Sequence, residues 1–295
     1  MQKNCFHIRF STPRQCLMDG LWYGGSKPRR ALVFVHGLGS NAFGHHDYLA
    51  PLADRNTAVV FFSNRGHDLL SRTRRSGFDR AWKRKAVLAG AVREIFADCV
   101  DDLQGVVNLL RKEHVKEIYL VGHSTGCQKS VFYLAQSGRQ KYVRGAVLLC
   151  PVSDYAAVHR FTDAGKLRLA QDVARELLRK RKPHEYLPPE IWPDLIDAQR
   201  FVSLYTPNGQ EELFHYAQPQ KIPQALRRIR IPLRVVLAEN DEYHDRDTQE
   251  IAAWFSANLR STRGSVSIIP HAGHSFKGQE DRVANEVRAW IRGLS

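Results

Sequence analysis

The sequence predicts an α/β fold with a mostly parallel central sheet, helices on both faces and an inserted helical cap. Three observations support this. Apolar, β-branched runs alternate with segments of helical period, most of these runs end in small or polar residues, and one long segment lacks any strand pattern. Such alternation is typical of a parallel sheet covered on both faces. With 295 residues, 43% of them hydrophobic, the chain can bury one large core.

Eight strands are expected in the main sheet. The runs CFHIRF (5–10) and CLMDGLWYGG (16–25) predict an opening hairpin. The six further strand candidates cover residues 30–37, 57–66, 117–124, 143–153, 233–241 and 265–273. Because the carboxyl ends of parallel strands share one edge of a sheet, the polar residues there are expected to build a site.

Helices and a cap account for the rest of the chain. Apolar residues three and four positions apart predict one long helix from Val92 to Leu110 and a closing helix over 282–294. Residues 160–182 predict a basic amphipathic helix, whereas four prolines interrupt residues 183–197. We therefore divide the chain into a first core part (1–153), a cap insertion (154–229) and a second core part (230–295).

Composition narrows the class of protein. The 44 basic and 30 acidic side chains give a formal charge of +14, with dense basic runs at 72–85 and 175–182. A basic surface can attract nucleic acid, but no nucleic-acid-binding motif is present, so no such partner is expected. The five cysteines contain no CxxC pair, and polar residues interrupt every apolar run near the N-terminus. We expect a soluble cytoplasmic protein without a membrane span, and the oligomeric state is open.

The pentapeptide GHSTG, residues 122–126, carries the strongest chemical signal. It fits Gly-x-Ser-x-Gly between a predicted strand and a predicted helix, the setting in which a sharp turn exposes a nucleophilic serine, Ser124. A serine nucleophile needs a histidine base and an acid that orients it, and both are found downstream at strand ends as His274 and Asp241. His271 is the alternative base. The alternative acids are Asp154, Glu239, Glu242 and Asp245.

Backbone amides are expected to stabilise the oxyanion. The amide of Thr125 follows the nucleophile, and the His-Gly-x-Gly loop that begins at His36 offers Leu38 as the second donor. His36 and His123 flank these donors and are candidate substrate contacts. His123 in this position is more often a packing residue.

Two further polar clusters have two interpretations each. In SNRGHD, Arg65 and His67 are candidate contacts for a substrate oxygen, but a hydrogen-bonded network that braces the loop is favoured, since charges near a sheet are usually paired. In GHHDYL, residues 44–49, the two histidines and the aspartate could bind a metal ion. Adjacent histidines usually point apart, so we expect no metal and assign these residues to the pocket entrance.

Taken together, these motifs resemble the α/β-hydrolase superfamily over nearly the full chain. The segments HGLGSN, FFSNRGHD, FADCVDDL, VGHSTGCQKSVFYL, LLCPVSD and AENDEY resemble a branch that includes fungal esterases of siderophores. The resemblance implies a Ser124, Asp241 and His274 triad that cleaves a carboxylic ester without a cofactor. The basic cap favours an anionic or oxygen-rich substrate, such as a siderophore-like ester. The alternatives are a thioesterase or lysophospholipase-like hydrolase and a non-catalytic ligand receptor.

Overall fold

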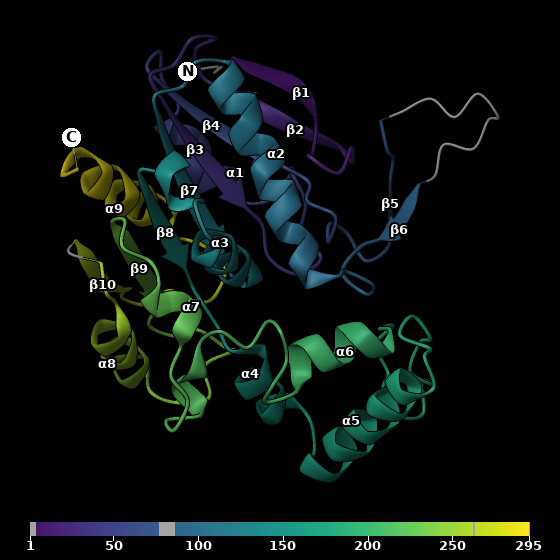
Figure 1. Ribbon diagram of the computed structural model, residues 1–295. Helices are drawn as coiled ribbons and strands as arrows, with labels where there is room; N and C mark the ends of the chain where they lie inside the picture. The colour runs from purple at the N-terminus through teal and green to yellow at the C-terminus, as the bar shows by residue number, and fades with distance from the viewer. Residues whose placement is uncertain (1–3, 77–85, 262, 295) are drawn as a thin grey trace.

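The computed structural model describes residues 4–76, 86–261 and 263–294. Its main sheet has eight strands in the order β1-β2-β4-β3-β7-β8-β9-β10 (Figure 1). These strands are β1 (Cys5–Ser11), β2 (Leu17–Tyr23), β3 (Arg30–Val35), β4 (Thr57–Phe62), β7 (Glu117–His123), β8 (Gly145–Leu149), β9 (Leu233–Ala238) and β10 (Gly264–Ile269). In this sheet β2 pairs antiparallel with both β1 and β4, and every other pair of neighbouring strands is parallel. The predicted fold class, an α/β-hydrolase fold, is confirmed.

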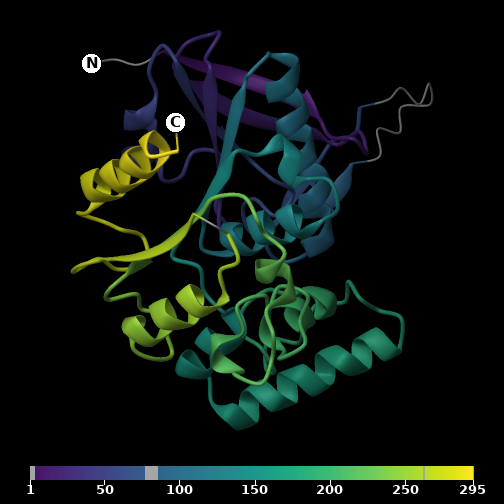
Figure 2. The ribbon, with the colours of Figure 1, turned by 60° about the vertical axis from the view of Figure 1, so that its left-hand side comes forward.

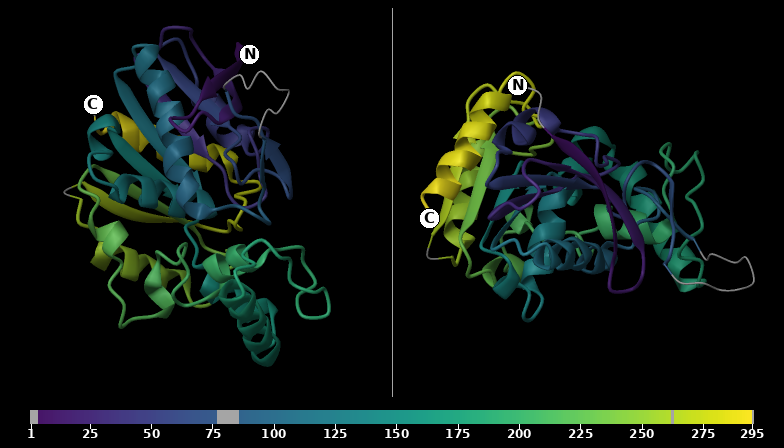
Figure 3. Two further views of the ribbon diagram at one scale, coloured as in Figure 1. Left: turned by 45° about the vertical axis from the view of Figure 1, so that its right-hand side comes forward. Right: turned by 90° about the horizontal axis from the view of Figure 1, so that it is seen from above.

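Helices cover both faces of the sheet. On one face the apolar core includes α2 (Cys99–Lys112), α3 (Thr125–Ala135), α7 (Gln224–Arg227) and α8 (Thr248–Asn258). The core on the other face includes α1 (His46–Leu49) and α9 (Glu280–Arg292). The central strands β3, β4, β7 and β8 are buried almost throughout, which explains their uninterrupted apolar runs. Seen from above, α9 lies on the left of the molecule and the cap lies on the right (Figure 3).

The cap contains α4 (Asp154–Phe161), α5 (Ala164–Arg179) and α6 (Ala198–Tyr205), which pack around an apolar cluster of their own. The long helix α5 runs along the outer side of the cap (Figure 2). Apolar side chains from Phe214 onward belong instead to the main core. Within the 154–229 insertion, the separate core therefore ends near Leu204.

Two predicted helices differ from the structure. The helix expected from Val92 begins only at Cys99, after a short 3-10 turn, because the Val92 carbonyl and Gln199 tie residues 92–94 to the cap. The basic helix expected over 160–182 is divided between α4 and α5. The division falls at Asp163, which is the N-cap of α5. Its side chain accepts hydrogen bonds from the amides of Gly165 and Lys166 and so starts a new helix.

The basic run 72–85 begins in β5 (Ser71–Thr73), which pairs with β6 (Val87–Ala89). Residues 77–85 of this run lie outside the described part of the chain. None of the helices in the described ranges is long and apolar enough to cross a membrane. All five cysteines are free, and only Cys5 is exposed.

Candidate active site

Ser124 stands at the turn between β7 and α3 with φ 54° and ψ −128°, a backbone conformation that side-chain-bearing residues rarely adopt. The flanking glycines make this turn possible. A Cβ on Gly122 would lie 2.5 Å from the Gly126 carbonyl oxygen, and one on Gly126 would lie 1.9 Å from the Val35 carbonyl oxygen. The spacing of Gly-x-Ser-x-Gly is thus a steric requirement, and it leaves Ser124 lining a pocket.

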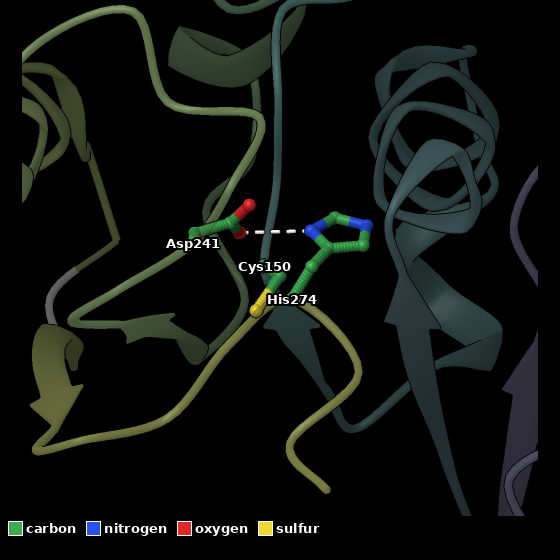
Figure 4. Close-up of side chains that lie close together, drawn as sticks. All are labelled: Cys150, Asp241 and His274. Carbon is green, nitrogen blue, oxygen red and sulfur yellow. Dashed lines mark hydrogen bonds and ion pairs between the residues drawn. The ribbon is translucent and has the colours of Figure 1, made fainter.

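Asp241 and His274 are joined directly at the ends of β9 and β10. The Nδ1 atom of His274 lies 2.8 Å from Oδ2 of Asp241 (Figure 4). Burial raises the pKa of Asp241, but the hydrogen bond from His274 and its charge outweigh burial, so this pKa lies below its usual value. An ionised Asp241 accepts the Nδ1 proton, which leaves Nε2 of the imidazole able to accept another.

The alternative acids and the alternative base have other contacts. His271 is exposed, and its ring lies 3.5 Å from Glu239. Glu242 accepts the backbone amide of His274 at 2.9 Å, so it holds the loop rather than the imidazole. The other two alternative acids, Asp154 and Asp245, contact the side chains of Gln128 and Arg246.

The predicted oxyanion donors lie beside the nucleophile. Gly37 approaches so closely that a Cβ there would lie 2.9 Å from the Ser124 Cβ. Leu38 lines the same pocket as Ser124. Within the described residues, neither the Leu38 amide nor the Thr125 amide donates a hydrogen bond to another group. Two unused amides next to a serine are what an oxyanion hole requires.

His36 lies beneath this loop, not in the pocket. It is completely buried, and its Nδ1 donates to the Gly37 carbonyl at 2.9 Å while Nε2 accepts the Asn64 amide at 3.1 Å. Burial lowers the pKa of His36 to about 3, which keeps the ring neutral and suits one donor and one acceptor. With both nitrogens engaged, the prediction of a substrate contact at His36 does not fit the structure.

Arg65 and His67 are also placed away from the pocket. The Arg65 guanidinium is buried and contacts Asp98, Asp101 and Asp102, at 3.1 Å, 2.7 Å and 2.7 Å. This is the bracing network that the sequence favoured, so Arg65 is not free to bind substrate. His67 pairs with Asp68 and lines a different hollow.

Two histidines do line the pocket. His123 donates from Nε2 to the His274 carbonyl at 2.9 Å, and its ring centroid lies 4.6 Å from that of His45. Burial lowers the pKa of both, so both are neutral near pH 7. His45 thus lines the pocket. His46 instead bonds Tyr23 and stacks on Phe61.

Cys150 was not predicted from the sequence as part of the site. Its thiol lies with Asp241 and His274 so that one ligand atom from each residue falls within 4.8 Å of the others (Figure 4). These donors could in principle bind a soft metal ion. Burial raises the pKa of the Cys150 thiol, and the facing atoms of Asp241 and His274 already pair with each other. The cluster is better described as an acid and base packed on a neutral thiol.

The pocket lies between the sheet edge and the cap, with a volume of about 670 Å³. The core contributes Leu38, Ser124 and His274, and the cap contributes apolar side chains such as Phe161 and Trp192. A cleft of this size, lined by apolar groups around a few polar ones, is typical of a small-molecule site.

A buried ionic cluster lies between α3 and the cap. Lys129 of α3 pairs with Glu94 at 2.8 Å, Glu94 pairs with Arg200 of α6 at 3.0 Å, and Arg200 also contacts Glu211. One weak sequence signal of this cluster is Lys129 itself, the one charged residue of α3. The cluster ties α3, the helix that follows Ser124, to the cap.

The sequence profile of the family described as "Protein of unknown function (DUF1749)" matches residues 22–292. The chain belongs to this family. It is also similar to the UPF0613 protein PB24D3.06c of Schizosaccharomyces pombe, at 26% identity over 182 residues, or 54% of this chain and 57% of that protein. The match thus spans little more than half of the relative's length.

Solved structures share the fold at low identity. The siderophore hydrolase EstB from Aspergillus fumigatus superposes with a TM-score of 0.68 at 17% identity, covering 99% of this chain and 98% of that one. The α/β hydrolase GrgF from Penicillium sp. sh18 gives 0.69 at 14% identity, with 99% of each chain covered. The carboxylesterase CesB from Bacillus subtilis gives 0.56 at 18% identity, covering 99% and 93%. These likenesses establish an α/β-hydrolase fold.

Proposed function

We propose that this protein is a serine hydrolase that cleaves carboxylic esters through an acyl-enzyme intermediate. The observation that carries the proposal is that His274, which is hydrogen-bonded to Asp241, lines the same pocket as Ser124, and that Ser124 stands at a strained strand-to-helix turn. Proteins of the same fold are named as a siderophore hydrolase and a carboxylesterase, which agrees with this chemistry.

In the proposed reaction, His274 accepts the hydroxyl proton of Ser124 at Nε2 while the serine oxygen attacks the ester carbonyl carbon. The carbonyl oxygen gains negative charge and is stabilised by the amides of Leu38 and Thr125. His274 then donates its proton to the departing alkoxide, which leaves as the alcohol. An acyl group remains on Ser124.

Water completes the cycle. His274 takes a proton from the water as it attacks the acyl carbon, and returning that proton to Ser124 frees the carboxylic acid. Asp241 stays ionised throughout, holds the Nδ1 proton and stabilises the charged imidazolium. The proposed chemistry needs no cofactor.

The positions of the basic side chains do not support an anionic substrate. The basic side chains of α5 are exposed, and several pair with acids on the same helix, as Arg175 does with Asp172 and Arg179 with Glu176. Of the α5 cations, only Lys166 lines the pocket. The charge of the cap is therefore directed mainly at solvent.

Intact-mass spectrometry after exposure to a fluorophosphonate tests the proposal. The wild-type protein should gain one adduct, and Ser124→Ala should gain none and hydrolyse no p-nitrophenyl ester. Ser256→Ala is the matched control, because Ser256 is an exposed serine on α8, and it should label like the wild type. An adduct on Ser124→Ala, or ester turnover by it, would contradict the assignment.

A further inference from the structure

The charge of the catalytic pocket is opposite to that of the molecule. The chain carries a formal +14. The pocket is nevertheless lined by four acidic side chains, of Asp154, Asp163, Asp194 and Glu242, and by the single ammonium group of Lys166. The neutral rings of His45 and His123 add no positive charge near pH 7. The pocket is thus an acidic region in a basic protein.

The carboxylates come from separate segments that surround the cavity. Asp154 begins α4, Asp194 lies in the proline-rich part of the cap, and Glu242 follows the catalytic acid. Asp163 caps α5, where its side chain accepts the backbone amides of Gly165 and Lys166. A ligand in the pocket therefore meets negative charge on more than one side.

Aromatic rings form a second, independent feature of the same cavity. Phe161, Trp192, Tyr205 and Tyr243 all line it. Tyr243 stands edge-on to His274 at a centroid distance of 4.7 Å and to Phe161 at 5.8 Å, so the rings continue from the base to the cap. Aromatic faces attract cations, and more strongly in a desolvated site. Carboxylates combined with aromatic faces favour a ligand with a positively charged nitrogen.

We propose that this pocket selects esters that carry an ammonium group, either a protonated amine or a quaternary nitrogen. This inference rests on the proposed ester hydrolysis and names its substrate class. The negative charge of Asp194 attracts the ammonium and Asp154 adds to it once ionised, the aromatic rings enclose the alkyl groups of the ammonium, and the ester carbonyl lies at Ser124. An anionic acyl group, the expectation from the basic cap, is disfavoured by the same charges.

Asp154 adds a dependence on pH. Burial and the charge of Glu211 outweigh the opposing charge of Arg200 and raise the pKa of Asp154 to about 8, so this carboxyl is largely protonated at pH 7. An ammonium beside it would favour ionisation, and the preference for cationic esters should grow between pH 7 and pH 9. The groups around Asp154 are Gln128, Arg200, Tyr205, Glu211, Glu212 and Tyr243.

A matched pair of substrates tests the inference. Butyrylcholine and 3,3-dimethylbutyl butyrate share the acyl group and the shape, and differ in having a charged nitrogen or a neutral carbon. With the full chain, kcat/KM should be roughly tenfold higher for the choline ester. The ratio should fall as NaCl is raised from about 50 mM to about 500 mM, since salt screens charge. A ratio of one or less would overturn the proposal.

Variants locate the effect. Asp194→Asn changes an exposed side chain and should lower the ratio without affecting folding, and Asp154→Asn should lower it and remove its rise with pH. Asp172→Asn is the control, because this exposed acid of α5 is not part of the pocket lining, and it should leave the ratio unchanged. A ratio that persists in both pocket variants would refute the assignment of these residues.

Failure of this inference is distinguishable from failure of the proposed function. Turnover of the neutral ester and labelling of Ser124, with no preference for the cation, would overturn only the substrate class. Without turnover or labelling, the hydrolase proposal itself would fail. Calorimetric titration of Ser124→Ala with both esters measures recognition apart from catalysis, and equal affinities would overturn the ammonium proposal by themselves.

Discussion

Glu94→Gln probes the buried ionic cluster between α3 and the cap. The two Glu94 oxygens lie 2.8 Å from the Lys129 ammonium and 3.0 Å from the Arg200 guanidinium, and both cations are 0% exposed. Glutamine has nearly the same shape, so the substitution removes charge and little else. It also turns an amide NH2 group toward one of the two cations, which loses Glu94 as an acceptor.

Breaking a buried ion pair typically costs about 3–5 kcal/mol. Here Asn64 still accepts from Lys129 at 3.2 Å and Glu211 still contacts Arg200, so we expect the lower end, about 3 kcal/mol. Burial raises the pKa of Glu94, but Lys129 and Arg200 outweigh it, so this pKa lies below its usual value. The stabilisation is therefore present above about pH 4.5 and is lost as pH falls through the lowered pKa.

Urea unfolding at pH 7 and at pH 4 measures this effect. Glu94→Gln should lose about 3 kcal/mol at pH 7, or melt lower by about 6 °C or more, and the loss should shrink at the lower pH. Glu176→Gln, an exposed acid in surface pairs on α5, should change stability by less than about 0.5 kcal/mol. If Glu94→Gln lost no more than this control at pH 7, the view that the cluster fastens the cap to the core would be wrong.

Two further substitutions test the acid of the triad and a buried carboxyl. Asp241→Asn should lower kcat by roughly 10³–10⁴-fold with little change in KM, because the wrong His274 tautomer is favoured, and steady-state kinetics on a p-nitrophenyl ester would show it. Burial raises the pKa of Glu212 from 4.5 to about 7 in the folded protein. Because the folded state holds this proton more tightly than the unfolded chain, folding stability falls as pH rises from about 4.5 through 7. Glu212→Gln keeps an acceptor for Ser153 and should exceed the wild type in stability at pH 9, by up to about 3 kcal/mol, with no gain at pH 4; thermal unfolding at the two pH values would decide.

The strands and the sharp turn at Ser124 were predictable because their sequence signals are local. Uninterrupted apolar runs such as TAVVFF follow from burial on both faces of the sheet. Gly122 and Gly126 follow from backbone contacts so close that a Cβ would not fit. The pairing of Asp241 with His274 followed from two adjacent strands ending at one edge. In each case a few neighbouring residues carry the physical cause.

Side-chain direction was not predictable in this way. His36 and Arg65 stand at strand ends, where sites are built, yet both turn inward to partners distant in sequence, Asn64 for one and Asp102 for the other. The late start of α2 has a similar origin, since contacts from the cap, around 100 residues later, hold residues 92–94 out of the helix. Such partners leave no periodic pattern around the residue itself.

The acidic pocket shows why net charge is a poor guide to a substrate. Carboxylates have short side chains and accept backbone amides, so they are used where loops turn: Asp163 caps α5, and Glu242 holds the amide of His274. Lysine and arginine have long stems that carry their charge out to solvent, as along α5. The loops that shape a cavity therefore gather acids even when the surface is basic, and the charge that a ligand meets is set by the turns.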